Sequence, residues 1–173
     1  MSALLDGLAP YFYQVAYVIP DLDKAQEWCR RVFGVKHFGT MEAELGSSAD
    51  APFFYRGKPA QASIKIALGD MNGTELELIE PRSEGSLWAE HLETRGPGLH
   101  HICFMVPEFE PAMTHFQANG FEPIIQGSNK NAGLHVEFAY FDCRTEGASY
   151  IELIWANEIG RAFMRDLRMG KQS

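Results

Sequence analysis

The chain has 173 residues, with 15 lysines and arginines against 23 aspartates and glutamates, and a formal net charge of −8. That length fits one globular domain, or two small modules that share a core. Hydrophobic residues make up 46% of the chain and aromatic residues 12%, which excludes a disordered protein. The negative charge disfavours a surface that follows phosphates, so we expect no nucleic acid partner.

The cysteines and the apolar segments indicate where in the cell the protein is expected. Cys29, Cys103 and Cys143 include no C-x-x-C pair, so they indicate neither a disulfide framework nor a thiolate metal site. The opening MSALLDGLAPYFYQ lacks a basic stretch before an apolar one, and no apolar run approaches the length of a membrane span. We therefore expect a cytoplasmic protein with no membrane partner.

The first half of the chain has the pattern β-α-β-β-β. An apolar strand over residues 13–20 leads into a helix that begins near Asp21 and ends at Gly34. A strand over 35–43 and a polar, mobile loop over 44–52 follow. The runs QASIKIAL and TELELIEP, on either side of a D-M-N-G turn, are typical of a hairpin.

The second half repeats this order after a linker over residues 82–97, which holds a short helix at 86–92. The pattern predicts a further helix at 108–119, a turn at 128–133, a C-terminal helix within 157–173, and strands at 99–107, 121–126, 135–142 and 149–155.

An internal repeat relates the two halves. Shifted by 87 positions, QVAYVIP at 14–20 falls on HICFMVP at 101–107, and LELI at 76–79 matches IELI at 151–154. Repeated units of this kind stack on one another to bury a shared core. The sequence therefore predicts an α+β fold of two tandem βαβββ modules, over about residues 11–81 and 98–156, within a single domain spanning 1–173.

Strand alternation decides which side chains face the concave side of the sheet. Gln14 lies on the face opposite Tyr17 and Ile19, which are bulky and should lie under the helix. The same rule puts His101 and Cys103 on the concave face of the second half.

Glu77 and Glu152 each lie inside an apolar run, where an ionised carboxylate is costly to bury without a partner. Taken singly, each would be interpreted as a buried salt-bridge partner; their equivalent repeat positions favour a functional role. One imidazole, two carboxylates and an amide oxygen on a concave face suit one divalent metal ion. The predicted ligands are Gln14, Glu77, His101 and Glu152.

These motifs resemble the vicinal oxygen chelate superfamily, which includes glyoxalase I, methylmalonyl-CoA epimerase, extradiol dioxygenases and bleomycin-resistance proteins. The resemblance covers Tyr13 to Trp155 and depends on QVAYVIPDLDKA, ELELIEP, GLHHICFMV and YIELIW. GLHHICFMV with ELELIEP resembles the epimerase branch most. The resemblance implies a cupped, eight-stranded mixed sheet around one metal ion, whose ligand positions match the same four residues.

This chain differs from each of two branches of the superfamily at particular positions. The epimerases usually have histidine where this chain has Gln14, whereas some zinc-type glyoxalase I enzymes have glutamine. Those glyoxalases hold the glutathione carboxylate with an arginine where Val18 stands here, and use an asparagine where Pro81 stands. The ligand set favours the glyoxalases, and the substrate-binding positions count against them.

The resemblance implies a metal-dependent isomerase or epimerase that abstracts a proton next to a carbonyl. Glu152 would be the base and Glu77 its counterpart on the other side, with Zn, Co, Ni, Mn or Mg as the ion. The expected substrate is an acyl-CoA thioester or a thiol adduct, and the expected assembly a homodimer. A glyoxalase I-type lactoylglutathione lyase is the alternative. An extradiol dioxygenase is disfavoured because Gln14 replaces an iron-binding histidine, and a non-catalytic binding protein because all four ligands are present.

Other polar residues are weaker candidates. His100 should face away from His101 and pack or lie on the surface, and Cys103 should pack as a small hydrophobic residue. Side chains on the second and seventh strands that could reach the cup are His37, Glu42, Glu44, His135 and Glu137; Glu42 or Glu44 could supply a second acid–base group. Bases that could meet an anionic substrate tail are Arg56, Lys58, Lys130 and Arg144.

Overall fold

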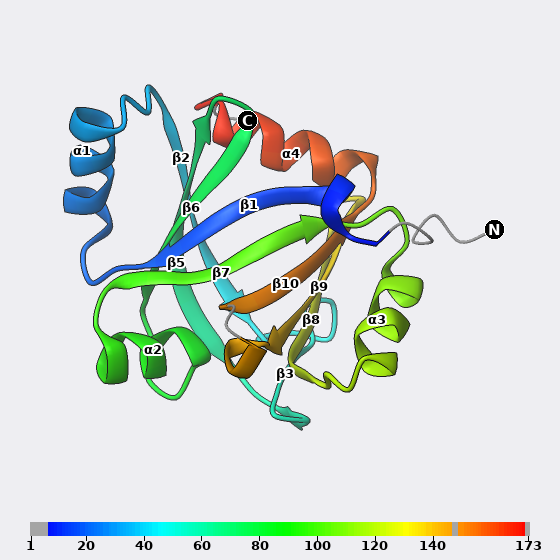
Figure 1. Ribbon diagram of the computed structural model, residues 1–173. Coiled ribbons are helices and arrows are strands. Elements are labelled where there is room, and N and C mark those ends of the chain that lie inside the picture. The colour runs from blue at the N-terminus through cyan, green and yellow to red at the C-terminus, as the bar shows by residue number, and fades with distance from the viewer. Residues whose placement is uncertain (1–6, 147–148, 172–173) are drawn as a thin grey trace.

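The computed structural model describes residues 7–146 and 149–171, which form one curled, mixed sheet of ten strands with four α-helices (Figure 1). The strands lie in the order β2-β5-β6-β1-β7-β10-β9-β8-β3-β4. The elements of the first module are β1 (Phe12–Val18), α1 (Leu22–Val32), β2 (Phe38–Leu45), β3 (Phe53–Tyr55), β4 (Lys58–Pro59), β5 (Ala62–Met71) and β6 (Thr74–Pro81).

The linker forms α2 (Leu87–Arg95), with Ser86 as its N-cap. The second module contains β7 (Gly98–Met105), α3 (Phe109–Ala118), β8 (Pro123–Asn131), β9 (Leu134–Asp142) and β10 (Tyr150–Ala156). Helix α4 (Glu158–Arg168) follows β10. Single-turn 3-10 helices at Ala9–Tyr11 and Arg144–Glu146 complete the described elements. None of the described helices has the length and apolarity needed to cross a membrane.

The sheet confirms the α+β class and the repeat. β1 runs parallel to β6 in the first module, as β7 runs parallel to β10 in the second. The modules join where β1 pairs with β7 in the antiparallel direction. The first strand of each module thus lies at the centre of the sheet, beside the last strand of its own module.

The predicted count of eight strands is wrong, because the segment after the polar loop adds β3 and β4. These short strands form a hairpin whose turn places Arg56 and Gly57 in the left-handed region, with φ of 51° and 74°. β3 then pairs with β8 of the other module. Strands of two and three residues are too short for hydrophobic alternation to reveal, and their pairing partner is distant in sequence.

The turn predicted at 128–133 is also shorter than expected. Residues 128–131 belong to β8 and pair with β9, so that only Ala132 and Gly133 form the turn. Both have positive φ, as a two-residue hairpin turn requires. The polar residues that suggested a loop are instead a strand, because backbone pairing with β9 prevails over their low strand propensity.

Three apolar clusters hold the layers together. Tyr17 and Ile19 pack with α1 on the convex face, as alternation predicts, and Ile102 and Phe104 lie in the equivalent cluster with α3. The third cluster fills part of the concave side and includes Trp88 of α2, which is 1% exposed. The concave face, called the cup below, is thus bounded by strands of both modules.

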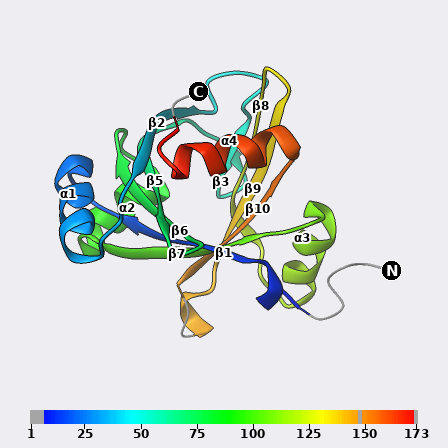
Figure 2. The same ribbon diagram turned by 90° about the horizontal axis from the view of Figure 1, so that it is seen from above.

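Helix α4 lies across the open side of the cup, between β2 and β8 in Figure 2, and contacts β2, β5, β9 and β10. Its C-terminal end packs against β2 at Gly39. A methyl group added to Gly39 would overlap the carbonyl group and the side chain of Leu167. The helix therefore bridges the two modules, and the absence of a side chain at Gly39 permits its close approach.

We expect Gly39→Ala to destabilise the protein by about 1–3 kcal/mol, because overpacked contacts force backbone shifts. Thermal unfolding measures the effect. Gly98→Ala is the matched control, since a methyl group there meets nothing within 4 Å, and we expect a change below about 0.5 kcal/mol. Equal unfolding temperatures for the two variants would show that α4 does not pack closely against Gly39.

Candidate active site at the floor of the cup

The predicted ligands come from four neighbouring strands, β6, β1, β7 and β10, in two adjacent rows across the sheet. One row aligns Glu75, Gln14, Cys103 and Glu152, and the next aligns Glu77, Ala16 and His101. Each row thus contains one polar residue from a first strand and one glutamate from the last strand of the other module.

The side chains of these rows converge on one imidazole nitrogen. Nε2 of His101 lies 3.0 Å from a Glu152 oxygen and 3.4 Å from a Glu77 oxygen. Oε1 of Gln14 lies 3.4 Å from the same nitrogen. His101 is fully buried, and the other three residues are at most 8% exposed.

Small residues at the centre of each row leave room for these longer side chains. Ala16 and Cys103 occupy equivalent repeat positions, and both are fully buried. Burial and the nearby Glu152 raise the pKa of the Cys103 thiol well above its usual value, so the thiol stays protonated. This supports the interpretation of Cys103 as a packing residue.

The donor set fits a divalent cation. Ligand atoms of Glu77, His101 and Glu152 all lie within 4.8 Å of one another. Oε2 of Glu77 is buried without a hydrogen-bond partner, and burial together with Glu152 raises the pKa of Glu77 well above its usual value. Two carboxylates held this close without a cation repel each other, which a metal ion would reverse. These three residues could therefore bind a metal ion, and the Gln14 oxygen lies beside them.

His100 controls the orientation of His101. It is fully buried, which confirms that it packs, but the prediction that it faces away from His101 is wrong, because its Nδ1 lies 3.0 Å from Nδ1 of His101. Strict alternation fails here because the pairing of β7 with β1 shifts register between Leu99 and His101. Burial lowers the pKa of His100 well below its usual value, so the ring stays neutral. When the Nδ1–H of His101 donates a hydrogen bond to Nδ1 of His100, the lone pair on Nε2 of His101 faces the carboxylates, as metal binding requires.

Glu75 is a buried carboxylate of the site to which sequence reasoning gave no role. It is 1% exposed and accepts hydrogen bonds of 2.8 Å from the Tyr13 hydroxyl and from Nε2 of Gln14. Because the amide nitrogen of Gln14 points to Glu75, its oxygen points to His101. Burial raises the pKa of Glu75 to about 7. Alternation places Glu75 beside Glu77, but its pairing with Gln14 depends on a register that the sequence does not display.

Tyr140 is a second residue that sequence reasoning missed. It pairs with Glu152 across β9 and β10, and its ring centroid lies 4.8 Å from that of His101. Burial, followed by the charge of Glu152, raises the pKa of its hydroxyl well above the usual value. The phenol therefore stays protonated and can donate to Glu152.

The second strand does not bring its acidic residues to the cup. Glu42 and Glu44 are exposed, whereas Met41, Ala43 and Leu45 of the same strand line the cup. Glu44 accepts a hydrogen bond from Ser63 at 2.6 Å. The alternation of β2 therefore removes both glutamates from the reacting centre.

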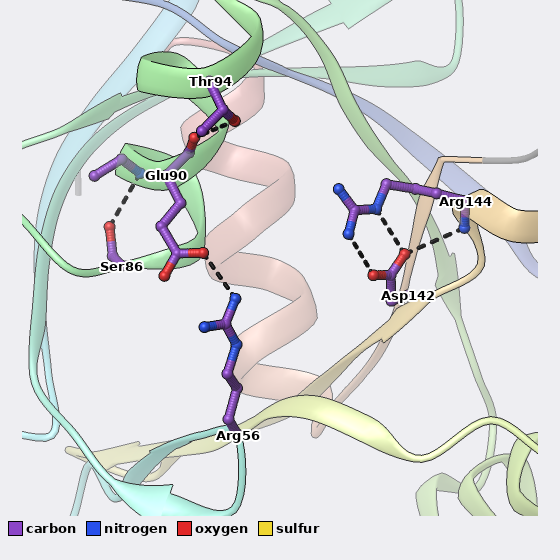
Figure 3. Close-up of polar contacts among 7 residues, drawn as sticks. Arg56, Ser86, Glu90, Thr94, Asp142 and Arg144 are labelled. Atoms are coloured by element: carbon purple, nitrogen blue, oxygen red, sulfur yellow. Dashed lines mark hydrogen bonds and ion pairs between the residues drawn. The ribbon is translucent and has the colours of Figure 1, made fainter.

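The remaining candidates also lie outside the floor of the cup, which is the part of the concave face formed by Gln14, Glu75, Glu77, His101 and Glu152. His37 borders a separate surface pocket beside the end of α4, and His135 pairs with Glu137 at 3.0 Å. Figure 3 shows Arg56 bound to Glu90 and Arg144 bound to Asp142, at 2.8 Å and 2.7 Å. Lys58 and Lys130 are exposed.

Comparisons with known proteins identify the family of the chain and show its fold. Residues 13–140 match the sequence model of the Glyoxalase/Bleomycin resistance protein/Dioxygenase superfamily. The chain is 28% identical to the ethylmalonyl-CoA/methylmalonyl-CoA epimerase of Cereibacter sphaeroides over 117 residues, which cover 67% of this chain and 75% of that protein. It is 26% identical to the mitochondrial methylmalonyl-CoA epimerase of Bos taurus over 100 residues, which cover 57% of this chain and about half (48%) of the bovine protein.

Solved structures show the same fold at lower identity. The chain is similar to methylmalonyl-CoA epimerase from Mycobacterium tuberculosis with a TM-score of 0.64 and 21% identity, covering 94% of this chain and 97% of that one. It is similar to a methylmalonyl-CoA epimerase in complex with methylmalonyl-CoA and NH4+ with a TM-score of 0.59 and 17% identity, covering 86% and 96% of the two chains. The chain belongs to the Glyoxalase/Bleomycin resistance protein/Dioxygenase superfamily.

Proposed function

We propose that this protein is a metal-dependent isomerase that removes a proton from the carbon next to a carbonyl group and returns it, as an epimerase does. One observation carries the proposal: two carboxylates, one from each module, flank a single buried imidazole nitrogen at 3.0 and 3.4 Å. The similarity to curated methylmalonyl-CoA epimerases supports the same chemistry.

The residues that would hold the ion are Gln14, Glu77, His101 and Glu152. Mixed oxygen and nitrogen donors favour Zn, Co, Ni, Mn or Mg over an ion that prefers thiolates. A bound divalent cation would supply Lewis-acid stabilisation of the negative charge that develops on a carbonyl oxygen. Glu75 and His100 orient the Gln14 amide and the His101 ring, so the donors are arranged before a ligand arrives.

Glu152 would take the proton from the substrate carbon, and Tyr140 would hold the carboxylate in place from β9. Glu77 enters from the other module, on the other side of His101. With one carboxyl group on each side of the carbon, the carboxylate on one face can take a proton while the other group, in its protonated form, donates a proton to the opposite face, which inverts the configuration. The apolar walls of the cup would limit the access of water to the reacting carbon.

Deuterium wash-in tests this proposal. We expect the metal-loaded protein in heavy water to exchange the α-proton of a 2-substituted acyl-CoA thioester, with methylmalonyl-CoA as the reference compound. The exchange should persist without oxygen, because proton transfer needs no redox change, and should stop with a chelator. Oxygen consumption on a catechol, with no exchange on any carbonyl substrate, would overturn the proposal in favour of a dioxygenase.

A glyoxalase I-type lyase is the second candidate, and Gln14 favours it because its oxygen points to the shared imidazole nitrogen. Val18 counts against it: this residue is fully buried in the cluster on the concave side and offers no charge to a glutathione carboxylate. Incubation with the hemithioacetal of methylglyoxal and glutathione separates the two. Lactoylglutathione formed without thioester exchange would favour the lyase.

A further inference from the structure

The walls of the cup are apolar above the acidic floor. The cavity has a volume of about 860 Å³, part of it open to solvent. Its polar lining, apart from Asn129, Tyr140 and Trp88, consists of the floor residues Gln14, Glu75, Glu77 and Glu152. The strands that build the walls contribute Leu45, Ile64, Ile66, Leu134, Val136 and Phe138.

Apart from the proposed metal ion, the cup offers no cation to a negatively charged substrate group. Among the residues that the structure describes, no lysine or arginine lines the cavity. Glu77 and Glu152 together already balance the charge of a divalent ion, and Glu75 adds a third acidic group beside them. A further carboxylate on the substrate would therefore be buried next to acidic groups without a compensating charge, which is unfavourable.

Helix α4 extends the apolar surface over the open side of the cup. Phe163 and Met164 line the same cavity, and the helix spans from β2 and β5 to β9 (Figure 2). A substrate group that enters between the floor and α4 is thus surrounded by side chains without charge. Burial of apolar groups in such a space is favourable, at roughly a fourfold gain in affinity per methylene.

We propose that the cup selects a substrate whose reacting carbon carries a neutral, apolar substituent, and disfavours malonyl-type acyl groups that carry a free carboxylate. This inference rests on the proposed function for the reaction itself, and defines the class of substrate: an aliphatic or aromatic ketone or thioester. The curated relatives are named for ethylmalonyl-CoA and methylmalonyl-CoA, so the substrate of this chain differs from theirs in charge.

Two matched thioesters test the charge preference. In 2-methylacetoacetyl-CoA an acetyl group replaces the carboxylate of methylmalonyl-CoA at similar size, and both compounds have an acidic α-proton. Calorimetric titration of the metal-loaded protein should give at least tenfold tighter binding of 2-methylacetoacetyl-CoA. Equal or tighter binding of methylmalonyl-CoA would overturn the inference.

Exchange measurements on the same two compounds separate this inference from the proposed function. Each enzymatic rate is divided by the uncatalysed rate in the same buffer, which corrects for the difference in α-proton acidity. Tighter binding of the neutral thioester without exchange on either compound would refute the isomerase and retain the preference for a neutral ligand. Exchange on both, with methylmalonyl-CoA accelerated more and bound more tightly, would retain the isomerase and refute the preference.

A pair of variants on one strand tests the physical cause. Met41 faces the cup and Glu42, its neighbour on β2, is exposed on the other side. Met41→Lys should shift the affinity ratio about tenfold toward methylmalonyl-CoA, whereas Glu42→Lys should leave the ratio unchanged although it alters the net charge more. An identical ratio in wild type and Met41→Lys would contradict the role of wall charge. If Met41→Lys does not fold, the wild-type affinities alone decide.

Discussion

Glu152→Gln is expected to lower the rate of α-proton exchange by about 10²–10⁴, the usual contribution of a positioned base. The substitution keeps the size of the side chain and an oxygen that can bind a metal ion, but the amide cannot take a proton. Exchange rates compared at full metal loading isolate this effect from any loss of metal affinity. The fold should persist, because the Glu152 carboxylate interacts with the polar groups of His101 and Tyr140, with which an amide can also form hydrogen bonds.

Glu137→Gln is the matched control for this loss. Glu137 lies on β9 and pairs with His135 outside the floor of the cup, at 3.0 Å. We expect it to retain wild-type exchange. A Glu152→Gln rate above one tenth of the wild-type rate would show that another group removes the proton.

Glu77→Gln is expected to stabilise the metal-free protein and to lose that advantage when metal is added. Burial and the charge of Glu152 raise the pKa of Glu77 well above the usual carboxyl value of 4.5. The folded protein therefore binds a proton at pH values where the unfolded chain has released it. Holding that proton therefore costs free energy that increases with pH above the usual carboxyl pKa, and glutamine removes this cost.

The sign of the pH dependence follows from the same proton. Since the folded state binds more protons than the unfolded state, the stability of the metal-free wild type should fall as pH rises above 4.5, until the pKa of folded Glu77 is reached. Glutamine has no such dependence, so the gain should vanish near pH 4 and grow toward pH 7. Urea unfolding of both proteins at pH 4, 5.5 and 7 measures it.

The metal reverses the order of stability, because ion binding to the folded state stabilises it and a neutral amide binds a cation more weakly than a carboxylate does. With saturating metal the wild type should be the more stable protein. A Glu77→Gln variant that is less stable than the wild type both with and without metal would identify Glu77 as a structural residue.

Most of the site could be predicted from the sequence because the repeat places equivalent residues at equivalent depths. Gln14 and His101 lie at equivalent positions of the first strands, and Glu77 and Glu152 interrupt apolar last strands, so alternation alone puts all four on one face. The structure brings these four together around a single nitrogen. A polar residue inside an apolar strand thus indicates a functional site when it recurs at the equivalent position of a repeat, whereas a single such residue does not.

Features that depend on the register of strand pairing, or on contacts between residues distant in sequence, could not be predicted from the sequence. Glu75 and Tyr140 join the site only because β6 aligns Glu75 with Gln14 and β9 aligns Tyr140 with Glu152. The β3 strand exists because β8 of the other module offers it a partner. The C-terminal helix was predicted from its amphipathic pattern, but its position over the cup depends on Gly39, whose role the local sequence does not reveal.

Metal content tests the four-ligand site most directly. Protein purified without chelator, and analysed by inductively coupled plasma mass spectrometry, should contain one divalent ion per chain. His101→Ala removes the nitrogen on which the carboxylates converge and should lower the content to background, whereas His135→Ala, which removes an imidazole outside the cup, should retain it. Equal metal content in wild type and His101→Ala would contradict the assignment of the site.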